Sequence, residues 1–417
     1  MTRHLGLFGL CALAVCHLCQ GAEIKAGSGD VTVRCLTVGK KVIPVFAQCG
    51  HLWIFNIKPP DLVLINNSKD PVKVGEVVLT AMAAGREVVR TTILTEVISA
   101  AMEQVHAQWR AKLGDGPLGT VMEPMLATGL GEMNFGGARL ADGATVKPGE
   151  CGIIMLSQLQ FLSHTGAMKL EGLKISVAVE ERGKPQTLEP PVPYVAYECK
   201  GRYRFPLGGD CTLVCMPMNV TQHRKALSQE FAIDVLDAGP AVDGVLSGAR
   251  APSPSKLEDY AIYHRSVMAV GDGTVMTTGN RYPDAVQANP ASLSLAEIDR
   301  LMEKSIPKLG FLHALAGNYI VIDHGNGEFS FYAHLAENTI TVKPGDTVRK
   351  GDIIAAVGNT GRSTEPHLHF QMMDGPNFLE ANGLPVMFDG IPPNVMNDNY
   401  TAANTLMGSD HICLRAE

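Results

Sequence analysis

Residues 317–335 read GNYIVIDHGNGEFSFYAHL, and residues 342–371 read VKPGDTVRKGDIIAAVGNTGRSTEPHLHFQ. In the first stretch two alternating runs flank Asn326-Gly327, a dipeptide typical of a two-residue hairpin turn. Pairing the strands on that turn places Tyr319 opposite His334. These stretches predict an antiparallel β core in the C-terminal part of the chain.

Three histidines of these stretches fall where strand alternation gathers side chains. In PHLHF, residues 366–370, His367 and His369 are two positions apart, so a strand projects both from one face. In EFSFYAHL, residues 328–335, alternation puts His334 on the more polar face. Such a set suits a zinc ligand with adjacent acid–base groups, although an isolated HxH pair also suits a solvated strand face.

An upstream segment offers a carboxylate in a similar setting. In FAIDV, residues 231–235, the apolar residues share one face and Asp234 lies on the other. His223 precedes it by eleven positions. Taken alone this pair indicates little, because an aspartate on a strand is usually solvated.

The two quoted stretches together closely resemble the catalytic core of lysostaphin-type zinc metallopeptidases. These are peptidoglycan endopeptidase-like enzymes with the duplicated hybrid motif, secreted or periplasmic, that typically cut peptide cross-links of bacterial cell walls. The resemblance extends less specifically over residues 200–385. It implies Zn2+ as cofactor, a peptide or peptidoglycan substrate and a zinc-activated water as nucleophile.

The family pattern also implies roles for individual residues. The histidine of YAHL and the first histidine of HxH form the catalytic pair, which here are His334 and His367. The second histidine of HxH, His369, corresponds to a zinc ligand. The remaining two ligands correspond to His223 and Asp234.

The spacing of the upstream ligands departs from the family pattern. Family members place them a few residues apart, whereas ten residues separate His223 from Asp234 here. Either a local loop accommodates the extra length, or another histidine takes the place of His223. His264 is the alternative to consider.

The sequence fits other functions less well than a peptidase. The segment VKPGDTVRKGDIIAAVG also resembles biotinyl and lipoyl carrier domains, but no lysine stands at a tight hairpin for attachment. HExxH and GxSxG motifs are absent from the sequence, which argues against thermolysin-like and α/β-hydrolase sites. A peptidase-like domain that has lost catalysis and serves as a binding or regulatory module stays as the alternative.

The composition indicates the number of domains and excludes one class of binding partner. The chain has 417 residues, of which 46% are hydrophobic and 18% charged, so it can form the cores of about two domains. Lys and Arg total 35 against 42 Asp and Glu, and no long basic run is present, so nucleic acid is not an expected partner. The sequence does not specify an oligomeric state.

The expected fold is mainly β. Residues 196–417 should form an antiparallel β-sandwich or barrel-like peptidase domain with its core at 219–385 and a helical insertion at 280–316. The helix of that insertion should open at Ser292 or Ser294. Residues 23–195 should form a β-rich domain, with strands near 72–79 and 170–179 and a helix at 95–112. This domain could position substrate, bind a partner or cover the cleft.

The first 22 residues have the layout of a secretory signal peptide. A basic start precedes an apolar stretch of about 15 residues, short of the roughly 20 that span a bilayer, and small residues follow. We therefore expect a secreted or periplasmic protein with no transmembrane segment after cleavage. Of the 10 cysteines, three lie in this segment, which leaves up to three disulfides for an oxidising compartment.

Overall fold

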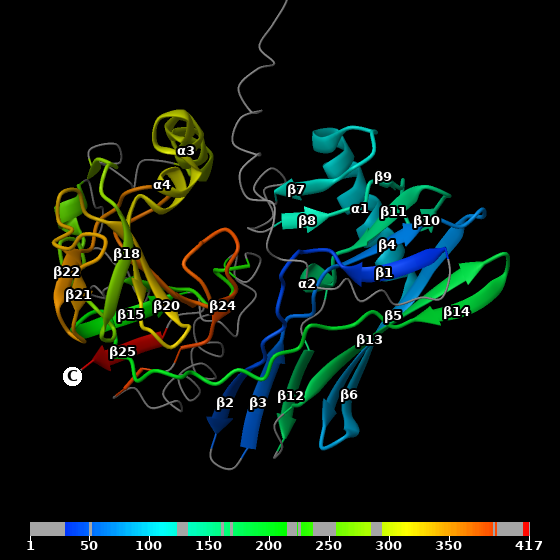
Figure 1. Cartoon of the computed structure of the whole chain (residues 1–417), viewed down its shortest axis with the longest axis horizontal. Coiled ribbons are helices and arrows are strands. Elements are labelled where there is room, and N and C mark those ends of the chain that lie inside the picture. Colours follow the sequence, from blue (N-terminus) through cyan, green and yellow to red (C-terminus); the bar gives the residue numbers. More distant parts are fainter. Residues whose placement is uncertain are drawn as a thin grey trace, which may run out of the picture.

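The chain is described here by a computed structural model (Figure 1). The structure describes residues 30–49, 52–122, 132–159, 162–166, 170–214, 223, 227–236, 256–284, 294–386, 388–389 and 412–416. The expected signal peptide at 1–22 lies outside these residues. Strands predominate over helices in the described parts, which confirms the mainly β prediction.

The described strands of the first half form four separate sheets (Figure 1, on the right of the view). One contains β1 (Val31–Cys35), β4 (Leu62–Asn66), β11 (Glu150–Ile154) and β9 (Arg139–Leu140). A second contains β10 (Thr145–Val146), β5 (Val72–Ala83), β13 (Gly172–Glu181), β14 (Lys184–Leu188) and β6 (Arg86–Ile93). The other two contain β2 (Val45–Cys49), β3 (Leu52–Ile57) and β12 (Leu162–Gly166), and β7 (Thr120–Met122) with β8 (Glu132–Asn134).

Two helices accompany these sheets. The long helix α1 (Thr95–Leu113) buries Ile98, Met102 and Trp109 against the sheets, as its apolar spacing predicts, and α2 (Leu156–Leu159) is a single turn. No helix in the described parts of the chain has the length and apolar character needed to cross a membrane.

The second half is built on one large antiparallel sheet. Its strands run in the order β21 (Thr347–Val348), β18 (Gly273–Gly279), β19 (Asn318–Asp323), β20 (Phe329–Leu335), β23 (Leu368–Met373), β16 (Ile233–Leu236), β15 (Gly209–Val214) and β25 (Ile412–Ala416), with β24 (Gly383–Leu384) on β23. Of the described strands, none of the first half pairs with one of this sheet. The division into two domains near residue 195 stays a proposal.

A small second layer covers one face of the large sheet. It pairs β17 (Ser266–Met268) with β22 (Ile353–Ala356), and a 3-10 turn at Leu257–Asp259 precedes it. Val267 and Ile354 from this layer share one hydrophobic core with Ile320 and Phe370 of the large sheet. The expected sandwich is therefore present. The described strands β21 and β25 lie at opposite ends of the large sheet, so this sheet is not a closed barrel.

The helical insertion lies between β18 and β19. It contains α3 (Leu295–Leu309) and α4 (Phe311–Ala316). Ser294 is the N-cap of α3: it accepts a hydrogen bond from the backbone of Glu297, whose side chain returns to Ser294. This capping box explains why the helix begins at Ser294.

The hairpin turn has three residues, one more than the two that were predicted. Asp323 pairs with Phe329, and His324 N–H donates to the carbonyl of Glu328 at 3.1 Å, which leaves a three-residue turn at 325–327. The ladder then shifts register between Ile320, paired with Tyr332, and the start of the strand. A bulge therefore replaces the expected one-to-one pairing of residues 319 and 334.

A short segment of the first half contacts the second half directly. Lys40 forms an ion pair with Glu230, and both side chains are almost completely buried. The side-chain amide of Asn382 donates to the carbonyl of Gly39 at 3.0 Å. Ile43 belongs to the hydrophobic core of the second half. Deleting residues 23–195 would therefore expose part of that core as well as removing any cover.

Candidate active site

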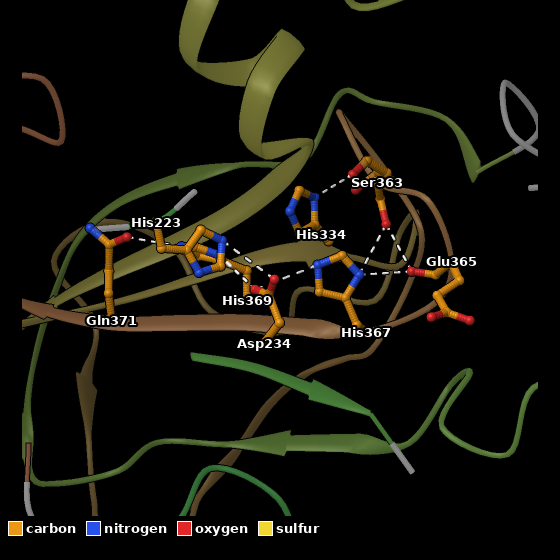
Figure 2. Close-up of polar contacts among 9 residues, drawn as sticks. His223, Asp234, His334, Ser363, Glu365, His367, His369 and Gln371 are labelled. Carbon is orange, nitrogen blue, oxygen red and sulfur yellow. Dashed lines mark hydrogen bonds and ion pairs between the residues drawn. The ribbon is translucent and has the colours of Figure 1, made fainter. Parts of the chain in front are cut away.

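Adjacent strands of the large sheet bring the candidate residues together. On β23, Leu368 and Phe370 enter the core between the layers, so His369 and Gln371 project from the opposite face. Asp234 on β16 is the cross-strand neighbour of His369. The lone described residue of its segment, His223, lies over the same face (Figure 2).

Three of the five predicted site residues form a compact group of metal-binding type. One potential ligand atom from each of His223, Asp234 and His369 lies within 4.8 Å of the others. Asp234 Oδ1 lies 2.9 Å from His369 Nδ1, and Asp234 Oδ2 lies 3.4 Å from His223 Nε2. The ten residues between His223 and Asp234 therefore do not prevent the two side chains from meeting. The alternative, His264, is exposed and is not part of this group.

His334 reaches the site through an unusual backbone conformation. Its φ is 59°, in the left-handed region that residues with a Cβ seldom adopt. Tyr332 lies in the hydrophobic core, whereas the bulge turns His334 towards His367, with ring centroids 4.6 Å apart. The expectation that simple alternation puts His334 on the more polar face of its strand is therefore wrong. Strained residues of this kind gather at functional sites.

His367 completes the group from the loop just before β23. Its Nδ1 lies 2.7 Å from the carbonyl oxygen of Glu365 and 3.1 Å from Ser363 Oγ. Its Nε2 lies 3.7 Å from Asp234 Oδ1. One nitrogen of the ring is thus held by the loop, and the other faces the carboxylate (Figure 2).

Three of the four site histidines have a hydrogen-bond acceptor beside one ring nitrogen. His334 Nδ1 donates to the carbonyl of Thr360 at 2.7 Å, and His367 Nδ1 donates to that of Glu365. His369 Nε2 lies 2.9 Å from the amide oxygen of Gln371. Because a neutral imidazole carries one N–H, the second nitrogen of His334 and of His367 is left as an acceptor.

Comparison with known proteins adds independent evidence. Residues 305–383 match the sequence profile of Peptidase family M23. The second half of the chain carries an M23 peptidase domain. The match includes the positions of His334, His367 and His369, and begins after His223 and Asp234. The structure alone therefore brings the two upstream residues to the M23 domain's site.

Curated relatives resemble the M23 domain over a short stretch. The peptidoglycan DD-endopeptidase ShyA of Vibrio cholerae is 49% identical over 61 residues, 15% of this chain and 14% of that protein. The DD-carboxypeptidase/endopeptidase Mpg of Neisseria meningitidis is 41% identical over 70 residues, 17% of this chain and 14% of that protein. The chain thus matches only about a seventh of each relative's length.

Among solved structures, the catalytic domain of the antimicrobial peptidase lysostaphin from Staphylococcus simulans is similar. It shares 19% identity, the similarity covers 44% of this chain and 87% of that one, and the TM-score is 0.20. This score is too low to support an argument about function.

The electrostatics of the M23 domain's site favour a bound cation. Burial lowers the pKa of His223 to about 4, and burial with the adjacent His367 and His369 lowers the pKa of His334 well below 6.5. Burial by itself would raise the pKa of Asp234, but the neighbouring histidines outweigh it and hold that pKa below its usual value. Neutral imidazoles beside an ionised carboxylate are the protonation states that a metal ion requires.

The donor set fits zinc in particular. Zinc at catalytic sites takes three protein ligands, commonly imidazole nitrogens and a carboxylate, and keeps a further position open. His223, Asp234 and His369 supply two imidazoles and one carboxylate. The imidazoles of His334 and His367 lie beside this set.

Sequence analysis missed three residues that hold the histidines in place: Thr360, Ser363 and Gln371. The sequence carried a signal for Gln371, because it continues the period of two from His367 and His369. No comparable signal marks Thr360 or Ser363, since a backbone carbonyl and a loop hydroxyl can be supplied by many residue types.

Proposed function

We propose that the M23 domain is a zinc-dependent metalloendopeptidase that hydrolyses peptide bonds in the cross-links of bacterial peptidoglycan. The observation that carries the proposal is the convergence of His223, Asp234 and His369 next to His334 and His367. The named activity of the Vibrio relative, a peptidoglycan DD-endopeptidase, supports peptidoglycan as the substrate. A cell-wall substrate and the signal-like first 22 residues support action outside the cytoplasm.

The five residues divide into two roles. His223, Asp234 and His369 would hold the metal, with His223 Nε2 and His369 Nδ1 facing the carboxylate between them. When bound, zinc would polarise the scissile carbonyl and lower the pKa of water to about 7.

The remaining two histidines handle protons. With its pKa well below 6.5, His334 is neutral at pH 7, and its Nε2 can accept a proton because Nδ1 donates to Thr360. His367, whose Nδ1 is likewise held by the loop, presents Nε2 on the same side. One of the two would take the proton of the nucleophile and the other would stabilise the charge on the carbonyl oxygen.

Digestion of purified peptidoglycan by the zinc-loaded chain tests the proposal. Mass spectrometry of the fragments should show cleaved cross-links that a chelator abolishes. His334→Ala should lower the rate by about 100- to 10,000-fold while zinc stays bound. His369→Ala should lose zinc, whereas His264→Ala, which removes an exposed histidine outside the group, should keep both zinc and activity.

The outcomes separate the two functions considered for this domain. Zinc-dependent fragments that require His334 support the enzyme. One zinc ion per chain without any cleavage product would contradict the peptidase and favour a binding module.

A further inference from the structure

Gln371 is a fully buried polar residue that neither the family pattern nor the proposed chemistry uses. It follows His369 by two positions on β23, pairs across the sheet with Phe331 and has no exposed surface. Its amide oxygen lies 2.9 Å from His369 Nε2. Its neighbour on the same face, Met373, belongs to an apolar cluster that also contains Phe331.

The amide nitrogen of Gln371 has no hydrogen-bond partner in the described structure. A buried N–H left without a partner costs free energy, and such groups in native proteins call for an explanation. An apolar residue would suit this apolar face better than an amide. The benefit of Gln371 must therefore come from its oxygen, whose one partner is His369.

The two nitrogens of His369 face two oxygens. Nδ1 lies 2.9 Å from Asp234 Oδ1, and Nε2 lies 2.9 Å from Gln371 Oε1. A neutral imidazole can donate to only one of them. If the proton is on Nε2, the amide oxygen of Gln371 accepts it in a hydrogen bond, and the lone pair of Nδ1 and the carboxylate face each other as two acceptors. A cation between them turns that repulsion into coordination.

We infer that Gln371 is a positioning residue that holds the proton of His369 on Nε2 and so presents Nδ1 to the metal. This inference rests on the proposed function for the identity of the metal, but the tautomer itself is a property of the metal-free chain. Without the amide oxygen, His369 would place its proton on Nδ1 and donate to Asp234. Both groups would then have to give up that hydrogen bond before binding zinc.

Two substitutions separate this role from simple packing. Gln371→Met keeps the length of the side chain and removes both the acceptor and the unpaired amide nitrogen. Gln371→Glu keeps an acceptor at the same place. Gln104→Met, at an exposed position of α1, is the control for a Gln-to-Met change elsewhere.

The tautomer is measured on the full-length metal-free chain with 15N-labelled histidine by two-bond proton–nitrogen correlation NMR. His369 should carry its proton on Nε2 in the wild type and on Nδ1 in Gln371→Met. Zinc affinity is measured by competition with a chromophoric chelator. It should fall about 10- to 100-fold in Gln371→Met and stay within about threefold of the wild type in Gln371→Glu and Gln104→Met.

Thermal unfolding of the metal-free chains gives a third readout. A packing role predicts that Gln371→Met unfolds at a lower temperature, whereas the positioning role predicts an unchanged or higher one. A wild-type His369 with its proton on Nδ1, or a Gln371→Met chain with wild-type zinc affinity, overturns the inference. A wild-type chain that binds no zinc overturns the proposed function, and the tautomer still decides the role of Gln371.

Discussion

Replacing Glu328 by methionine should destabilise the second half by about 4 kcal/mol. Glu328 lies in the hairpin between β19 and β20 and has no exposed surface. Five donors converge on its carboxylate: the hydroxyls of Tyr197 and Tyr203 (the latter at 2.5 Å), the backbone N–H groups of Lys200 (2.7 Å) and Gly201 (3.0 Å), and the side-chain amide of Asn326 (2.9 Å). Four of them come from the segment that joins the two halves.

The magnitude follows from what the substitution leaves behind. Each buried donor without a partner costs about 1–3 kcal/mol, and breaking a buried charged network typically costs about 3–5 kcal/mol. The two hydroxyls can rotate towards other acceptors, whereas the backbone N–H groups of Lys200 and Gly201 cannot. A cost of about 4 kcal/mol is therefore a middle value. Glu328→Gln keeps one acceptor oxygen, so its loss in the free energy of unfolding should be about half that of Glu328→Met.

Urea denaturation, followed by far-UV circular dichroism, measures the change in the free energy of unfolding. Glu303→Gln, on the exposed face of α3, is the control and should lie within about 0.5 kcal/mol of the wild type. A Glu328→Met chain within about 1 kcal/mol of the wild type would refute the reasoning, because it would mean that water satisfies the donors.

The same carboxylate predicts a pH dependence. Burial opposes ionisation, but the hydrogen bonds from Lys200, Tyr197 and Tyr203 outweigh it and hold the pKa of Glu328 below its usual value. Its stabilisation is therefore present above about pH 4.5 and is lost as the pH falls through the lower pKa of the folded state. Glu328→Gln should lose less stability over that acidic range than the wild type.

Two further predictions concern other parts of the fold. Gly361→Ala should destabilise the loop that holds His334, because φ at Gly361 is +77° and a Cβ there would lie 2.2 Å from the backbone nitrogen of Gly317. Differential scanning calorimetry should show a lower melting temperature for this variant. An unchanged melting temperature would contradict the close approach of the two backbones. In the first half, burial lowers the pKa of His106 to about 4, and its Nε2 accepts from the Ile153 N–H. The unfolded chain, with a histidine pKa of about 6.5, takes up this proton first as the pH falls, so stability should drop by about 3 kcal/mol between pH 6.5 and 4. Denaturation at several pH values should show a smaller drop in His106→Gln, and equal drops would be inconsistent with a neutral buried imidazole.

Strand alternation predicted much of the fold and of the site. Because successive side chains of a strand point to opposite faces, PHLHF predicted that His369 projects away from its immediate neighbours, and in the structure Leu368 and Phe370 enter the core on the other face. The apolar spacing of residues 95–112 likewise predicted α1 to within one residue. Both patterns depend only on local geometry, so they can be read from sequence.

Features that depend on backbone exceptions and on distant contacts could not be predicted. The bulge that turns His334 into the site breaks the alternation on which the prediction relied. The three-residue turn depends on glycines at 325 and 327 that both adopt positive φ, which a Gly-Asn-Gly sequence permits without requiring it. The buried ion pair of Lys40 and Glu230 joins residues 190 positions apart, and no local pattern specifies such a contact.

The identity of the first metal ligand shows the same limit. The distance along the chain between His223 and Asp234 departed from the family pattern and left His264 as an alternative. In the structure His223 Nε2 lies 3.4 Å from the carboxylate, while His264 is exposed and stands outside the group. Spacing in sequence restricts a ligand set, but only the fold decides which side chains meet.

Crystals of the zinc-loaded chain, measured on both sides of the zinc absorption edge, test the central claim most directly. The account predicts one strong anomalous peak bounded by His223, Asp234 and His369, with His334 and His367 beside it. A peak held by His264 in place of His223, or no peak at this site in zinc-loaded crystals, would contradict it.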